Sequence, residues 1–222
     1  MPRKKLFPTD LFPIHVTARS FNREWFDLPT HQMWDIFSRY LYFCTLIYGI
    51  RIHSFVLMSN HFHLLITDQQ RKLDEAMAYL LKEVSRAVKG ESAETSDVFD
   101  GGCNCSVIRN RVYYDFAYKY VYRNPVEARI SEKVEAYPFS SLRGLLGMDH
   151  LSFPAFDNSN LIANPNAQLR WLNSPFPTTE FLDEIRQGLK LPKFEMFEDP
   201  ARAVSTKELF RAAPNKNLIL NQ

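Results

Sequence analysis

The chain has 222 residues, of which 45% are hydrophobic and 23% are charged, and its formal net charge is +2. This composition is that of an ordinary globular protein with a sizeable core, and three cysteines, an odd number, exclude a disulfide framework. No apolar run is long enough to span a bilayer, so we expect a cytoplasmic protein. The small net charge permits a nucleic-acid partner only if the basic residues cluster.

The first third of the chain predicts strands around one helix. Residues 11–19 are rich in β-branched and aromatic side chains, which is typical of a strand. Apolar residues then recur at helical spacing from residue 30 to about residue 48. Two further strands are predicted at 50–58 and 61–67. They are separated by Ser59-Asn60, a pair typical of a hairpin turn.

The next segments complete an α+β pattern. An amphipathic helix is predicted at 73–89, a short strand at 105–108 and a third helix at 112–123. We expect this last helix to end near Asn124, because Pro125 disfavours the helical conformation in the residue before it. The order of elements predicts an antiparallel sheet with helices packed on it. Beyond about residue 147 proline and asparagine become frequent, and one helix is predicted at 178–189.

Two histidines in the second strand of the hairpin stand out. Side chains alternate between the faces of a strand, so Phe62, Leu64 and Ile66 share the core face while His61 and His63 share the other. Two imidazoles placed in this way can converge on one metal ion or one phosphate. The alternative is a pair of ordinary histidines that hydrogen-bond to their neighbours, and the motif alone favours that alternative.

A second polar pair lies on the helix predicted at 112–123. Tyr120 and Asn124 are four residues apart and therefore lie on one side of this helix. A phenol, with an unperturbed pKa of about 10, becomes a competent nucleophile when a divalent cation polarises its target. An amide oxygen is an ordinary ligand for Mg²⁺ or Mn²⁺. The two histidines and this pair together indicate a phosphodiester-transfer site, and the competing interpretation is an aromatic stripe in the core.

These stretches resemble a known family. Its His–hydrophobic–His signature resembles V-L-M-S-N-H-F-H-L-L-I, and its tyrosine helix resembles Y-V-Y-R-N-P-V-E-A-R-I. The motifs P-I-H-V-T-A-R and Y-P-F-S-S-L are similar to the same family in the same order. The family is that of the REP-associated tyrosine transposases, the domesticated single-tyrosine HUH transposases of bacterial genomes. The resemblance covers residues 1–147, and the C-terminal extension at 148–222 has no matching motif.

The resemblance implies a fold, a site and a reaction. It implies a ferredoxin-like sheet, His61, His63 and Asn124 as ligands of Mg²⁺ or Mn²⁺, and Tyr120 as the nucleophile. It further implies a DNA strand transferase or nickase that acts on single-stranded, hairpin-bearing DNA through a 5′-phosphotyrosine intermediate. Such a protein is expected to associate with the nucleoid, as a monomer or a homodimer. Arg129 departs from the family, which commonly has a small residue there.

Basic residues predict where DNA binds. In the family the N-terminal region helps to read the DNA beside the hairpin, and basic residues near the tyrosine helix can line one groove. The expected DNA-binding residues are Arg3, Lys4, Lys5, Arg19, Arg109, Arg111 and Arg123. The ordinary alternative for such a cluster is a solvated surface.

Two other functions remain open at this point. One is a DNA-binding regulator in which the site is vestigial and recognition of a hairpin is the function. The other is a zinc hydrolase, which needs a third histidine or an acidic ligand and has no use for Tyr120.

Overall fold

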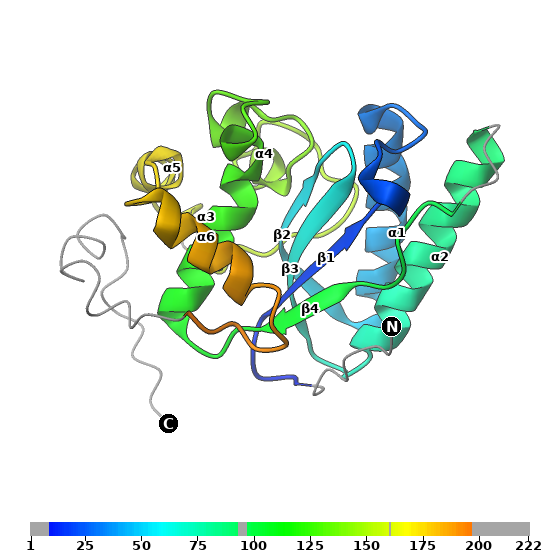
Figure 1. Ribbon diagram of the computed structural model, residues 1–222, viewed down its shortest axis with the longest axis horizontal. Coiled ribbons are helices and arrows are strands. Elements are labelled where there is room, and N and C mark those ends of the chain that lie inside the picture. Colours follow the sequence, from blue (N-terminus) through cyan, green and yellow to red (C-terminus); the bar gives the residue numbers. More distant parts are fainter. Residues whose placement is uncertain (1–8, 93–96, 160, 197–222) are drawn as a thin grey trace.

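The computed structural model describes residues 9–92, 97–159 and 161–196, and its sheet has the topology expected from the sequence (Figure 1). All neighbouring strands are antiparallel, in the order β2-β3-β1-β4. This α+β arrangement is the ferredoxin-like βαββαβ unit, so the predicted fold class is confirmed. Its elements are β1 (Ile14–Arg19), α1 (Thr30–Tyr48), β2 (Ile50–Leu57), β3 (His61–Asp68), α2 (Leu73–Glu91) and β4 (Asn104–Val107).

One face of the sheet is covered by α1 and α2, which lie side by side in Figure 1. The apolar positions that alternate along β1 and β3 point into the core on this side, including Ile14, Val16, Phe62, Leu64 and Ile66. The predicted assignment of faces in β3 is therefore correct. Its consequence is that the polar alternate positions of β1 and β3 all lie on the opposite face.

The opposite face is covered by the helices that follow β4 (Figure 1). The longest, α3 (Arg111–Glu127), packs with α4 (Ser141–Leu145), α5 (Pro165–Asn173) and α6 (Thr179–Gly188) around a second apolar core. The helix predicted at 178–189 is confirmed as α6, while α5 was not predicted. Two 3-10 turns, η1 (Phe21–Arg23) and η2 (Val134–Ala136), lie in the connections. No helix in the described ranges is both long and apolar enough to cross a membrane.

The end of α3 differs from the prediction. The helix runs on to Glu127 with Pro125 inside it, and the Ala128 amide still donates to the Asn124 carbonyl over 3.0 Å. The preference against a helical residue before proline is local, and the burial of Pro125 in the fold overrides it. Asn124 therefore stays in helical register, one turn after Tyr120 on the same side of α3.

Candidate active site

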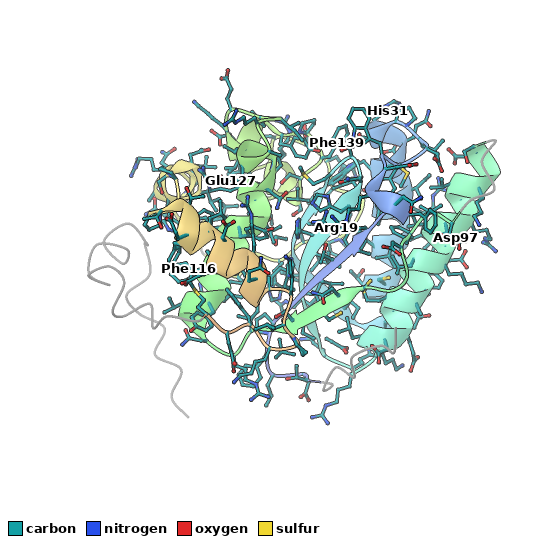
Figure 2. All side chains as sticks on the ribbon, in the orientation of Figure 1. Arg19, His31, Asp97, Phe116, Glu127 and Phe139 are labelled. Atoms are coloured by element: carbon teal, nitrogen blue, oxygen red, sulfur yellow. The ribbon has the colours of Figure 1, made fainter. Side chains whose placement is uncertain are left out.

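A cavity of about 640 Å³ opens between the polar face of the sheet and the second layer of helices. Strands β1 and β3 form one wall, and α3 and α6 form another. Figure 2 labels Arg19 on β1 and Glu127 on α3, both of which line it. The side chains with relevant chemistry are His15, Arg19, His61, His63, Tyr120, Asn124, Glu127, Arg186 and Lys190. The four residues predicted as nucleophile and metal ligands are thus brought together.

The imidazoles of both β3 histidines are hydrogen-bonded to neighbouring side chains. His61 Nδ1 donates to Asn60 Oδ1 over 2.7 Å. Asn124 Nδ2 donates to His63 Nε2 over 3.1 Å, so that the His63 proton is on Nδ1. Asn124 also hydrogen-bonds to His61. Both imidazoles therefore carry their proton on Nδ1 and their lone pair on Nε2, the nitrogen that can bind a metal ion. In His63 this lone pair accepts from Asn124 Nδ2, so a bound metal ion would take the place of that hydrogen bond.

His15, on β1, completes this arrangement although the sequence did not single it out. Its Nε2 lies 2.9 Å from His63 Nδ1 and accepts the proton of that nitrogen. The two rings stack, with centroids 5.2 Å apart. His15 is only 1% exposed, so it holds the His63 ring from within the protein. The available signal was the alternation of polar residues in P-I-H-V-T-A-R, which puts His15, Thr17 and Arg19 on one face of β1.

All three histidines are neutral at physiological pH. Burial lowers the pKa of His15 to about 3 and that of His61 to about 4, where the charge of Arg19 also contributes. Burial, together with the neighbouring His61, His15 and Arg19, lowers the pKa of His63 well below its usual range. Neutral imidazoles are competent ligands, whereas protonated ones are not.

Tyr120 faces the histidines from α3. Its ring centroid lies 5.3 Å from that of His63, and its side chain is 9% exposed. Burial raises the pKa of the Tyr120 phenol. The charge of Arg186 and hydrogen bonds from Asn124 and Arg186 oppose that rise. The hydroxyl is thus held between Asn124 on its own helix and Arg186 on α6.

The donor set fits a divalent cation. Two neutral imidazoles and one amide oxygen are suitable ligands for Mn²⁺ once the hydrogen bond from Asn124 Nδ2 to His63 Nε2 is given up, and the amide oxygen is suitable for Mg²⁺. Within residues 9–92, 97–159 and 161–196, no group of three or more His, Cys, Asp or Glu side chains could hold a metal ion. The residues that can do so here are His61, His63 and Asn124.

The predicted DNA-binding residues are dispersed in the structure. Arg19 is exposed and lines the cavity. Arg109 and Arg111 lie at the opposite end of α3, about 20 Å from Asn124 along the helix axis. Arg111 donates to the Asn158 carbonyl and pairs with Asp115. Arg3, Lys4 and Lys5 lie outside the described residues, so the basic arm stays a prediction.

Arg123 is the predicted DNA-binding residue whose position is least suited to that role. It is 6% exposed, pairs with Glu127 over 2.7 Å and donates to the carbonyls of Leu172 and Asn173. These contacts tie α3 to α5. We therefore do not propose Arg123 as a DNA-binding residue.

The comparison with solved structures identifies the fold. The chain is similar to the structure of a REP-associated tyrosine transposase bound to a REP hairpin, with a TM-score of 0.57 and 18% sequence identity. The match covers 70% of this chain and 93% of the other. The chain has the fold of a REP-associated tyrosine transposase. Comparisons of the sequence with protein-family models and with curated proteins find no match.

Proposed function

We propose that the protein is a metal-dependent DNA strand transferase or nickase that acts on single-stranded, hairpin-bearing DNA through a 5′-phosphotyrosine intermediate. The observation that carries the proposal is the convergence of His61, His63, Asn124 and Tyr120 in one cavity. A structure with the same fold was solved with a REP hairpin bound, and this supports DNA as the partner.

The chemistry follows from the positions of these side chains. The Tyr120 oxygen attacks the phosphorus of a DNA phosphodiester, and the bond from phosphorus to the 3′-oxygen breaks. The phenol gives up its proton and the departing 3′-oxygen takes one up, so the step is balanced. A cation held by His61, His63 and Asn124 would polarise the phosphate and neutralise developing charge. Attack of another 3′-hydroxyl on the phosphotyrosine reverses the step and joins two strands.

A single-stranded substrate suits the site. The cavity has room for one nucleotide and its phosphates rather than for a duplex, since typical ligand pockets of 300–1,000 Å³ hold molecules of that size. Arg19 at the cavity wall supplies a positive charge for the DNA backbone.

The experiment is a test for a covalent adduct between the protein and a labelled single-stranded hairpin in Mg²⁺ or Mn²⁺. Wild-type protein should form the adduct, and Tyr120→Phe should form none while it still binds the DNA. Tyr122→Phe is the matched control, because the Tyr122 hydroxyl pairs with Ser141 inside the second core, 3.0 Å away. Hairpin binding by the wild type without any adduct would instead support a vestigial site in a DNA-binding regulator.

A further inference from the structure

The C-terminal extension supplies part of the cavity. Arg186 and Gln187 lie at the end of α6, and Lys190 lies just beyond it. All three line the same cavity as His63 and Tyr120. No motif in this region predicted a role for it. Figure 1 shows α6 packed in front of α3, and the chain after α6 returns to the edge of the sheet at β4.

Helix α6 is fixed against α3 from one side. Phe181, Leu182 and Ile185 are buried in the core that α3 shares. The ring of Phe181 lies edge-on to that of Phe116 on α3, with centroids 5.1 Å apart. Thr178 caps the helix, since its hydroxyl accepts from the Phe181 amide.

The other end of α6 is fixed against the sheet. Asn104, on β4, donates from its side chain to the Leu189 carbonyl over 3.1 Å. The backbone of Val107 donates to Pro192 and accepts from Phe194, each over 2.9 Å. A Cβ added at Gly188 would lie 2.6 Å from the Glu195 carbonyl oxygen, so the chain is closely packed where α6 ends. Arg186 is therefore carried on a helix whose place is set by both α3 and β4.

The charge of Arg186 is available to a ligand. Its guanidinium donates to Asp183 over 2.9 Å and contacts the Tyr120 hydroxyl, yet its side chain remains 38% exposed. Of the two carboxylates in the cavity wall, Glu127 is paired with Arg123 and Asp100 lies on the opposite, strand side. A guanidinium has five donors in a planar fork that matches a phosphate.

We propose that Arg186 binds the DNA phosphate that Tyr120 attacks, so that α6 of the C-terminal extension is part of the catalytic site. This inference rests on the proposed function. The histidines act on the phosphate from the sheet, and Arg186 acts on it from α6, beside the attacking oxygen. Fixed positive charge at that point stabilises the negative charge that builds up on the phosphoryl oxygens.

Binding tests the contact without chemistry. In a Tyr120→Phe background, the affinity for a labelled hairpin with single-stranded flanks is measured across a salt series, with and without Arg186→Gln. Loss of one phosphate contact should weaken binding and lower the salt slope by about 0.7. Arg170→Gln, an exposed position on α5 away from the cavity, loses the same charge and should leave the slope unchanged.

The rate of adduct formation tests the catalytic role. At saturating DNA, Arg186→Gln should slow a single turnover by about 100-fold, and Arg186→Lys should recover part of that loss because it keeps the charge but not the fork. Thermal unfolding checks that each variant is folded, and Arg186→Met, which also removes the charge, replaces Arg186→Gln in both tests if Arg186→Gln is not folded. The inference is wrong if Arg186→Gln forms the adduct as fast as Arg170→Gln does. It is also wrong if Arg186→Gln leaves the salt slope of hairpin binding unchanged. If Arg186→Gln lowers the salt slope of hairpin binding but the wild type forms no adduct, the proposed nickase activity is contradicted and the phosphate contact of Arg186 is supported.

Discussion

The two histidines of β3 are oriented by neighbours on both sides of them. Asn60 holds Nδ1 of His61, and His15 holds Nδ1 of His63. Partners of this kind fix the tautomer and the ring orientation of a metal ligand, and they commonly change metal affinity by 10–100-fold. The orientation of both imidazoles thus depends on Asn60 and His15, which are not themselves proposed as metal ligands.

His15 should therefore matter for metal binding. His15→Leu removes the acceptor for His63 Nδ1, and we expect the affinity for Mn²⁺ to fall by about 10–100-fold. His15→Gln can place a side-chain oxygen near the same point and should retain most of the affinity. Titration calorimetry with Mn²⁺ measures both variants in the absence of DNA. Equal affinities in the two variants, with unchanged thermal stability, would show that His15 only fills space.

Sequence reasoning identified the site residues whose spacing is informative and missed those brought in by tertiary structure. His61 and His63 are two apart on a strand, and Tyr120 and Asn124 are one helical turn apart, so their faces follow from backbone geometry. His15 is 48 residues from His63, and its partner depends on the pairing of β1 with β3. Arg186 depends on how α6 docks, which no local pattern specifies.

At the scale of elements, packing rather than local preference decides where α3 ends. Pro125 predicted an end at Asn124, but its burial keeps the helix intact to Glu127. The strands and helices before it follow the predicted ranges closely, because their apolar periodicity is long and regular. The short helix α5 begins at Pro165 after an Asn164 cap, and its nine residues give too little periodicity to predict.

A buried polar network joins β2, β3 and α3. His53, on β2, is fully buried, with its Nε2 2.9 Å from the Thr67 hydroxyl and its Nδ1 3.1 Å from the Tyr114 hydroxyl. The Asn158 side chain approaches the same Nδ1. Burial, aided by the charges of Arg51 and Arg111, lowers the pKa of His53 to about 4.

This network predicts a loss of stability in mild acid. The unfolded chain protonates His53 as the pH falls through about 6.5, whereas the folded protein resists until about 4. The stability that neutral His53 contributes to the folded protein is therefore fully present above pH 6.5. It declines below that pH, by about 2 kcal/mol between pH 7 and 5. Urea unfolding at several pH values should show a shallower pH dependence for His53→Gln than for the wild type. Parallel curves for the two proteins would contradict this assignment.

On the scale of the whole molecule, the sheet has one core on each face, and the C-terminal region completes the second. Its contributors include Leu161, Trp171, Leu172, Phe176, Phe181, Leu182 and Ile185, which pack with aromatic residues of α3. The boundary expected at residue 147 reflects where recognisable motifs end. The division into a catalytic domain at 1–147 and a C-terminal extension at 148–222 stays a prediction, and because the two share a core we expect them to unfold together.

Truncation tests this point. A chain of residues 1–147 loses nine large apolar side chains from the second core, since Leu189 and Phe194 also belong to it, and each stabilises the fold by about 1.5–3 kcal/mol when buried. Their sum is comparable to the whole net stability of a domain, about 5–15 kcal/mol. We therefore expect residues 1–147 to aggregate or to bind a hydrophobic dye without a cooperative thermal transition. Residues 1–196 retain the whole second core and should give a cooperative thermal transition. Cooperative unfolding of residues 1–147 at the midpoint of the full chain would show that this segment folds without the C-terminal helices.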